Sequence, residues 1–194
     1  MFTGIITDVT RVTPGKMKDG ILKLAFKKPS GWTDLEIGES VATNGACLTV
    51  TAIRDDEYDC ELMHETLDKT SFGVKVPEKV NLERSLSLKD RLSGHFVQGH
   101  VDNVGKVTEV SQTNGYELSV EFPKKYTNLV ISKVSITIDG ISLTVAKCTY
   151  TTLTVALIPH TLERTTIGTL KAGDTVNLEF DMLGKYIDRI IKQK

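Results

Sequence analysis

Several signatures of common protein classes are missing from this 194-residue chain. Lys and Arg total 24 against 25 Asp and Glu, so the chain has no basic excess to neutralise nucleic-acid phosphates. No apolar run approaches the roughly 18–20 residues of a membrane-spanning helix. The start, MFTGIITDVTRV, lacks the basic residues and long apolar stretch of a signal peptide. We therefore expect no nucleic-acid partner and no membrane.

Cysteine is also scarce. Cys47, Cys60 and Cys148 are an odd number and form no C-x-x-C pair, so we expect reduced thiols in a cytoplasmic protein. His95 and His100 are five residues apart, a poor spacing for sharing a metal, and no cysteine or carboxylate stands at zinc-site spacing. We expect no metal site.

Motifs for nucleotide and hydrolase chemistry are absent too. The chain has no phosphate loop, no G-x-G-x-x-G after a strand and no G-x-S-x-G elbow. Its six Phe, five Tyr and one Trp are too few and too scattered for a nucleic-acid stacking surface.

The chain does contain a long internal repeat. Val41–Thr51 reads VATNGACLTVT, and Ile136–Ala146, 95 residues later, reads ITIDGISLTVA. Each copy places Asn-Gly or Asp-Gly between apolar runs, a pattern that predicts a β-hairpin with a type I′ turn.

The strand after each turn predicts one wall of a pocket. Side chains alternate in direction along a strand, so small polar residues share one face and aliphatic residues the other. The small face consists of Cys47, Thr49 and Thr51 in the first copy and of Ser142, Thr144 and Ala146 in the second. One copy alone fits a half-buried strand with its polar face in water, but the duplication favours a pocket.

The repeat covers most of the chain. LMHETLDKTSFG matches LIPHTLERTTIG at the same offset, and VNLE occurs at both 80–83 and 176–179. A period of about 95 residues indicates domain duplication rather than a solenoid. We expect one barrel over residues 1–97 and a second over 98–181, with the boundary near Ser93–Val97, and a C-terminal helix over 182–194.

Short strands and turns fill each unit. Six strands are predicted in the first unit, at Ile5–Val12, Ile21–Phe26, Glu39–Thr43, Ala46–Ile53, Tyr58–Met63 and Lys79–Arg84. So many strands in under 100 residues indicate a small closed barrel. Short helical turns are predicted at Thr33–Ile37, Tyr126–Ser132, His64–Gly73 and His160–Gly168.

The C-terminal segment has no counterpart in the first unit. Its apolar residues stand at 183, 186, 187, 190 and 191, which is helical spacing. This apolar stripe must be buried against another protein surface. The helix either folds back on its own barrel or packs against the same helix of another chain, and we favour the second.

Two side chains are candidates for chemistry. Cys47 would need a lowered pKa to act as a nucleophile, and no sequence neighbour supplies a base or cation, so packing in the barrel wall is the alternative. Its counterpart Ser142 argues against a nucleophilic role shared by both copies. His100 replaces the aliphatic Ile5 of the first repeat, and a neutral imidazole there fits proton transfer. A hydrogen-bonded linker histidine is the alternative.

The segments MFTGI, NGACLTV, GHFVQGHVD, DGISLTV and IPHTLERT, in this order and spacing, resemble the riboflavin synthase family over essentially the whole chain. The resemblance implies an all-β fold of two similar six-stranded antiparallel Greek-key barrels in tandem plus a C-terminal α-helix. It also implies a homotrimer assembled around those helices. The active site would lie between subunits, the N-terminal barrel of one chain facing the C-terminal barrel of its neighbour.

The reaction implied by the resemblance is a dismutation. One 6,7-dimethyl-8-ribityllumazine donates a four-carbon unit to a second, giving riboflavin and 5-amino-6-ribitylaminouracil without a metal or external cofactor. Two similar pockets in one chain fit a reaction between two copies of one substrate, since they convert two dilute molecules into an oriented pair.

The resemblance implies the site residues as well. The first pocket would comprise Gly4, Ile5, Ile6, Cys47, Leu48, Thr49, Glu61, Leu62, Met63, His64, Glu65 and Thr66. The second would comprise Gly99, His100, Val101, Lys133, Ser142, Leu143, Thr144, Ala156, Leu157, Ile158, Pro159, His160 and Thr161. Lys133, Asp139 and Asp181 would polarise ring or ribityl groups. The candidate catalytic residues are His100 for proton transfer, Cys47 and Ser40 for orientation or nucleophile activation, and Phe2.

A non-catalytic antenna protein of the same fold, which holds a lumazine or flavin without converting it, is the main alternative. Such proteins tend to keep one good pocket, whereas both pocket signatures are present here. A flavin-binding reductase barrel is a weaker alternative, because it carries an added nucleotide-binding domain for which this chain has no room.

Overall fold

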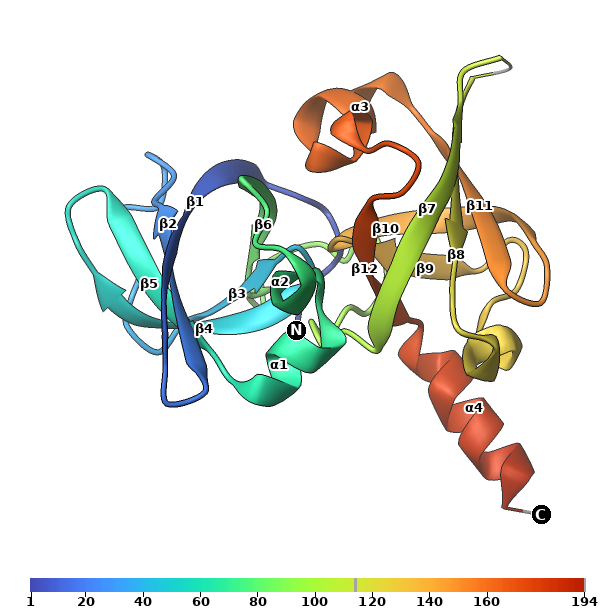
Figure 1. Cartoon of the computed structure of the whole chain (residues 1–194), viewed down its shortest axis with the longest axis horizontal. Coiled ribbons are helices and arrows are strands. Elements are labelled where there is room, and N and C mark those ends of the chain that lie inside the picture. The colour runs from blue at the N-terminus through green and yellow to red at the C-terminus, as the bar shows by residue number, and fades with distance from the viewer. Residues whose placement is uncertain (114, 194) are drawn as a thin grey trace.

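The computed structural model describes residues 1–113 and 115–193 and consists mainly of strands (Figure 1). The first barrel is formed by β1 (Asp8–Lys18), β2 (Ile21–Lys27), β3 (Ser40–Thr43), β4 (Ala46–Ile53), β5 (Glu57–Leu62) and β6 (Lys79–Arg84). The second is formed by β7 (Asn103–Ser111), β8 (Tyr116–Glu121), β9 (Ser135–Ile138), β10 (Ile141–Cys148), β11 (Thr152–Leu157) and β12 (Thr175–Phe180).

Both barrels are closed and have the same strand order. The first runs β1-β2-β5-β4-β3-β6, and the second runs β7-β8-β11-β10-β9-β12. In the first barrel β3, β4 and β5 pair in sequence order, and β6 returns to lie beside β3. In the second barrel β9, β10 and β11 pair in sequence order, and β12 returns to lie beside β9. This arrangement is a Greek key. All strand pairs within the barrels are antiparallel. The predicted fold class is confirmed.

The two hairpin turns have the predicted geometry. Asn44 and Gly45 have φ angles of 44° and 78°, and Asp139 and Gly140 have φ angles of 46° and 81°. Positive φ at both central residues defines the type I′ turn, whose twist matches that of the flanking strands. The strand registers fit two-residue turns, because Thr43 pairs with Ala46 across the first turn and Ile138 pairs with Ile141 across the second.

Two strand boundaries differ from the prediction. β1 begins at Asp8 rather than Ile5, because the backbone of Gly4 is bound at the other barrel. β1 also continues past the predicted end at Val12 to Lys18, through a bulge between Pro14 and Met17. A bulge accommodates an extra residue without ending the strand.

Three of the four predicted helical turns are present. His64–Gly73 contains α1 (His64–Lys69) and α2 (Ser71–Val74), and His160–Gly168 contains α3 (Pro159–Arg164) and most of η2 (Thr166–Thr169). The 3-10 helix η1 (Lys124–Leu129) overlaps the turn predicted at Tyr126–Ser132. The prediction at Thr33–Ile37 is wrong: this segment forms turns, which bury Leu35 while Asp34 is exposed and bonded to Arg84.

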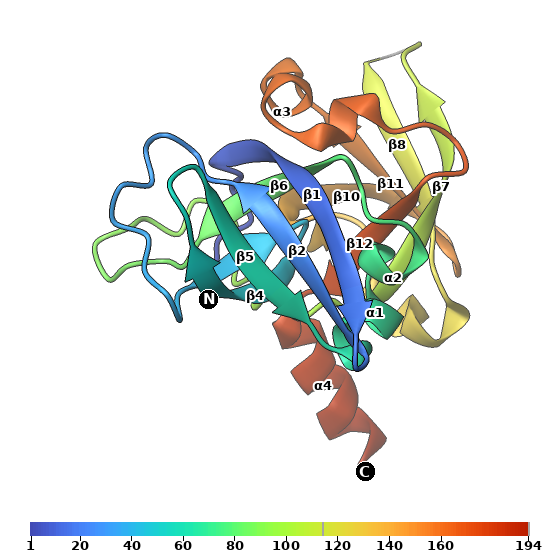
Figure 2. The same ribbon diagram turned by 60° about the vertical axis from the view of Figure 1, so that its left-hand side comes forward.

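The barrels lie next to each other (Figures 1 and 2) and touch at their hairpin turns. A Cβ atom at Gly45 would lie 2.7 Å from the backbone nitrogen of Gly140, so the two turns touch backbone to backbone. Asn81 Nδ2 donates to the Asp139 carbonyl (2.9 Å), and Asn177 Nδ2 donates to the Asn44 carbonyl (2.8 Å). These reciprocal bonds relate the barrels by an approximate two-fold axis.

The last helix, α4 (Met182–Lys192), projects away from the barrels (Figure 1). The Asp181 carboxylate caps its start by accepting from Leu183 N (2.9 Å). None of the α4 residues is buried, and its apolar stripe is more than half exposed at Leu183, Tyr186, Ile187, Ile190 and Ile191. Along the described chain, no helix is both long enough and apolar enough to cross a membrane.

Candidate active site

The two strands that follow the hairpin turns present matching outer faces. On β4, Leu48 and Val50 are buried, whereas Cys47 is half-buried and Thr49 is exposed. β10 repeats this burial pattern with Ser142 at the position of Cys47. The predicted alternation is confirmed.

The next strand in each barrel extends this face. On the first barrel β5 pairs with β4, and Glu61 and Met63 are exposed at its end. On the second barrel β11 pairs with β10, and Ala156 and Ile158 are exposed at the matching positions. A short helix follows each strand and begins with the exposed segment that carries His64 or His160. Each barrel therefore offers an open surface rather than an enclosed cavity.

Each face is bordered by a loop of the other repeat. Cys47 N donates to the Gly99 carbonyl (2.8 Å), and Ser142 N donates to the Gly4 carbonyl (2.7 Å). Both glycines have positive φ, 78° at Gly4 and 79° at Gly99. A Cβ at Gly4 would lie 2.6 Å from Ser142 Cβ, and a Cβ at Gly99 would lie 2.7 Å from Cys47 Cβ. Only glycine fits these contacts.

These contacts correct the expected grouping of the site residues. Gly4, Ile5 and Ile6 were expected with Cys47, and Gly99, His100 and Val101 with Ser142, but the loops are exchanged. Ile6 packs against the core of the second barrel, and Val101 packs against that of the first. The physical reason is that the N-terminal segment crosses over: Phe2 pairs with Val97 through two backbone hydrogen bonds of 2.7 and 3.1 Å.

We therefore define two half-sites. The first half-site consists of Ser40, Cys47–Thr49 and Glu61–Thr66 with the loop Gly99–Val101. The second half-site consists of Lys133, Ser142–Thr144 and Ala156–Thr161 with the loop Gly4–Ile6.

Two buried carboxylates, which were not among the predicted site residues, hold the loops. Glu83 accepts from Thr3 N (2.7 Å), Thr3 Oγ1 (2.7 Å) and Gly4 N (2.9 Å). Glu179 accepts from the backbone nitrogens of Gln98 (2.7 Å), Gly99 (2.9 Å) and His100 (3.1 Å). Burial raises the pKa of both carboxyls, while the hydrogen bonds they accept oppose this. The repeated VNLE was the available signal, because its Asn and Glu stand on one side of the strand and its Val and Leu on the other.

His95, which the sequence suggested only as a possible metal ligand, contacts a half-site residue. Its Nδ1 lies 2.7 Å from Ser142 Oγ, and its Nε2 lies 3.2 Å from Thr137 Oγ1. Burial lowers the pKa of His95, and Asp181 opposes this. Burial therefore favours the neutral form of this imidazole. His100, in contrast, has an exposed side chain at the edge of the first half-site.

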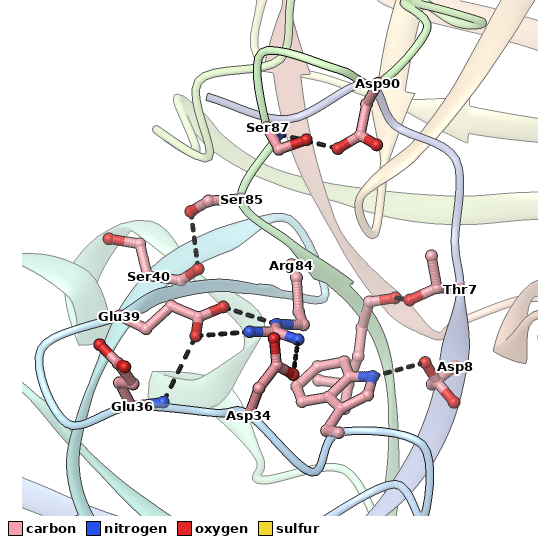
Figure 3. Close-up of polar contacts among 12 residues, drawn as sticks. Thr7, Asp8, Asp34, Glu36, Glu39, Ser40, Arg84, Ser85, Ser87 and Asp90 are labelled. Carbon is pink, nitrogen blue, oxygen red and sulfur yellow. Dashed lines mark hydrogen bonds and ion pairs between the residues drawn. The ribbon is translucent and has the colours of Figure 1, made fainter.

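The remaining catalytic candidates lie on the side of the first half-site. Phe2 is fully buried with Ala42 and Val97, and Cys47 packs against this cluster. The packing supports the structural alternative for Cys47. Ser40 pairs with Thr49, and its carbonyl accepts from Ser85 Oγ at 2.8 Å (Figure 3).

A polar cluster borders Ser40 (Figure 3). The Arg84 guanidinium bonds both oxygens of Glu39 (2.6 and 2.8 Å) and Asp34 Oδ1 (2.7 Å), and it lies over the Trp32 ring. The bonds to Glu39 and then to Asp34 raise the pKa of Arg84. We call Asp34, Glu39 and Arg84 the ion clasp. It fixes the loop that leads into β3.

The three residues predicted to polarise the substrate, Lys133, Asp139 and Asp181, lie in three separate parts of the molecule. Lys133 has a φ of 72°, and its backbone nitrogen donates to Val145 O (2.8 Å), as Gly38 does to Val50 O in the first barrel. A lysine held in a glycine-like conformation is a typical mark of function. Asp139 lies outside both half-sites, at the barrel interface, where burial raises its pKa to about 7. Asp181 caps α4 and also lies outside them.

Two hollows of the described surface lie elsewhere. A groove of about 1190 Å³ runs between the barrels and shares only Asp139 with the predicted residues. A smaller one, about 480 Å³, lies beneath the β1–β2 hairpin and shares only Glu61. The half-sites are shallow, with apolar side chains open to solvent at Ile5, Met63 and Ile158.

Comparison with known proteins agrees with this duplicated arrangement. The family model described as "Lumazine binding domain" matches residues 3–85 and 98–181. Riboflavin synthase of Actinobacillus pleuropneumoniae is 37% identical over 196 residues, covering 100% of this chain and 91% of that protein. Riboflavin synthase of Mycobacterium bovis is 38% identical, covering 99% of this chain and 98% of that protein. That of Bacillus subtilis is 37% identical, covering 98% and 90%.

Solved structures show the same fold. The crystal structure of LumP complexed with riboflavin aligns with a TM-score of 0.83 at 24% identity, covering 93% of this chain and 99% of that one. LumP complexed with 6,7-dimethyl-8-(1′-D-ribityl)lumazine aligns with a TM-score of 0.82 at 23% identity, covering 92% and 98%. At this level of identity the likeness concerns the fold alone.

Proposed function

The chain belongs to the riboflavin synthase family, and on this premise we propose that it catalyses the dismutation of two 6,7-dimethyl-8-ribityllumazine molecules. A four-carbon unit passes from one lumazine to the other, and the products are riboflavin and 5-amino-6-ribitylaminouracil. The enzyme is a transferase of riboflavin biosynthesis. The observation that carries this proposal is the duplicated half-site, one on each barrel and built from equivalent strands and loops.

The two half-sites support catalysis by proximity. A reaction between two molecules of one substrate gains most when both are bound with their reacting carbons adjacent. Cys47 N and Ser142 N are both occupied by glycine carbonyls, so the groups free to bind each ring come from the strand faces and the loops around them. Donors directed at the ring oxygens would stabilise the carbanion formed when the donor lumazine loses a C7-methyl proton.

His100 remains our candidate for that proton transfer, because its exposed imidazole stands beside the first half-site. Ser40, Cys47 and Phe2 are proposed to shape the first half-site, Phe2 through packing. Lys133 is proposed to contact substrate, and its backbone strain supports a functional rather than a structural role. We expect no metal or external cofactor in this reaction.

The half-sites are open, so we infer that they are completed between subunits of a homotrimer. The exposed apolar stripe of α4 supports assembly around this helix. Removal of residues 182–194 should give monomers that retain folded barrels and lose nearly all activity, as measured by light scattering and by riboflavin formation. A fully active monomer would refute the intersubunit site. The three cysteines of the described chain are free thiols, which supports a cytoplasmic location for the protein.

The direct test is to mix the purified protein with 6,7-dimethyl-8-ribityllumazine and follow the absorbance of riboflavin. Riboflavin should appear at half the molar amount of lumazine consumed. A non-catalytic antenna protein, favoured by the likeness to LumP, would bind the lumazine without forming riboflavin. Stable lumazine fluorescence with no flavin would therefore overturn the enzyme proposal.

A further inference from the structure

The loops that border the half-sites are anchored on one barrel and bound at the other. Glu83, on β6 of the first barrel, holds the backbone nitrogen of Gly4, whose carbonyl accepts from Ser142 N of the second barrel. Glu179, on β12 of the second barrel, holds the backbone nitrogen of Gly99, whose carbonyl accepts from Cys47 N of the first barrel. Each loop thus connects a carboxylate of one barrel to a strand of the other.

Packing follows the same cross-connection. Ile6, two residues after Gly4, contacts the core of the second barrel, and Val101, two residues after Gly99, contacts the core of the first. Displacement of either loop would therefore disturb the half-site on the barrel opposite to its anchor. The anchors themselves are only 5% and 3% exposed, at Glu83 and Glu179, so neither can reach substrate directly.

We propose that Glu83 and Glu179 are positioning residues and that each shapes the half-site of the opposite barrel. Glu83 organises the second half-site through the Gly4 loop, and Glu179 organises the first half-site through the Gly99 loop. The inference rests on the proposed function only in calling the half-sites substrate sites. The cross-connection itself is a property of the fold.

The chemistry of the contact requires a carboxylate. Three donors converge on each group: two N–H and one O–H at Glu83, and three N–H at Glu179. A carboxylate accepts at both oxygens, whereas a glutamine of the same size presents an NH2 donor to one of them. The Glu→Gln exchange therefore turns one attraction into a repulsion without changing volume.

The second half-site has an additional connection. His95 N donates to the Thr3 carbonyl (3.1 Å), and its ring bonds Ser142 Oγ (2.7 Å). The first half-site has a packing contact at this place instead, since Cys47 lies against the buried Phe2 cluster. Loss of Glu179 should therefore release its loop more completely than loss of Glu83.

Thiol reactivity reports each half-site separately. With Cys148→Ser as background, Cys47 is the reporter of the first half-site, because Cys60 is fully buried and burial raises its pKa to about 12. In a Cys47→Ser, Cys148→Ser background, Ser142→Cys supplies the equivalent reporter in the second. Iodoacetamide labelling is followed by mass spectrometry of the intact protein.

The expected pattern is crossed. Glu179→Gln should accelerate labelling of Cys47 about tenfold or more and leave the thiol at position 142 within twofold. Glu83→Gln should accelerate labelling at position 142 by a smaller factor and leave Cys47 within twofold. Acceleration on the same barrel as the substitution, on both barrels equally or on neither would overturn the proposal. If Glu83→Gln does not fold, Thr3→Val decides. It removes one of the three Glu83 contacts and the bond from Ile5 N to Thr3 Oγ1 (3.1 Å) in the same loop, and it should affect position 142 alone.

An activity measurement separates this inference from the proposed function. Both Glu→Gln variants should form riboflavin at least tenfold more slowly than the unmodified chain, because each distorts one half-site. If the unmodified chain forms no riboflavin, the proposed function fails, but the labelling pattern still decides the cross-connection.

Discussion

The two barrels fix equivalent loops with different chemistry. After the shared VNLE, the first barrel has Arg84, which binds Glu39 and Asp34 in the ion clasp (Figure 3). The second barrel has Phe180, whose ring centroid lies 4.7 Å from that of Tyr126 on η1. The loop before β3 is thus held by an ion pair network, and the loop before β9 by contact between two tilted aromatic rings.

Contacts between the barrels are the same in both repeats, whereas contacts within one barrel differ between the repeats. Both barrels share the type I′ turns, the loop glycines and the buried Asn and Glu of β6 and β12. The turns, the loop glycines and the Asn side chains make contacts that cross between barrels, and each Glu holds the backbone of the loop glycine that does so. Arg84 and Phe180 act within one barrel and have diverged. Symmetric positions serve the junction, and asymmetric positions are free to distinguish two identical substrates.

The largest expected effect tests the symmetric contact between the turns. Gly45→Ala and Gly140→Ala should each lower the free energy of unfolding by about 3–5 kcal/mol, because a Cβ would enter the opposite backbone at a positive φ. Gly20→Ala is the matched control, since Gly20 has a φ of 77° but no atom within 4 Å of its Cβ position. It should cost only about 1–2 kcal/mol. Equal losses at all three positions in urea unfolding would remove the role of the turn contact.

The second test uses the one polar difference at that contact, Asn44 against Asp139. Burial raises the folded-state pKa of Asp139 from 3.8 to about 7, so its contribution to stability is full below about pH 4 and is lost as the pH rises to about 7. Asp139→Asn should raise the unfolding free energy at pH 8 by up to about 4 kcal/mol and change little at pH 4. The Asn44 side chain already accepts the equivalent bond from Asn81 N (2.7 Å). A variant that is less stable at pH 8 would contradict this assignment.

The ion clasp is tested by Arg84→Met, which removes the cation and leaves Glu39 without its partner. The free energy of unfolding should fall by about 2–3 kcal/mol. Trp32 is the only tryptophan of the chain and lies under Arg84, so its fluorescence follows the first barrel. The matched variant Phe180→Leu should destabilise the second barrel and leave the Trp32 transition unchanged. A shift of that transition by Phe180→Leu would mean that the barrels unfold as one unit.

The smallest expected effect on stability concerns Lys133 against Gly38. Lys133→Gly should raise the unfolding free energy by up to about 1 kcal/mol, since glycine relieves the positive φ. Riboflavin formation should nevertheless fall tenfold or more if the side chain contacts substrate. Stability and activity would then change in opposite directions. Unchanged activity would contradict a contact between the Lys133 side chain and substrate.

Much of the fold could be predicted because its signals are local. Asn-Gly and Asp-Gly fixed the hairpins, the period of two fixed the outer faces of β4 and β10, and the period of the C-terminal stripe fixed α4. The prediction of a helical turn at Thr33–Ile37 was wrong, because the ion clasp and the buried Leu35, not local spacing, determine that loop.

The amino-acid sequence by itself determined two barrels, two equivalent strand faces and one exposed amphipathic helix. Only the tertiary structure decided that the Gly4 loop completes the second half-site and the Gly99 loop the first. It also decided that His95, rather than His100, contacts Ser142. The physical reason is that these choices depend on hydrogen bonds between residues far apart in the chain, 47 positions for His95 and Ser142 and 79 for Gly4 and Glu83. No local periodicity records such pairings.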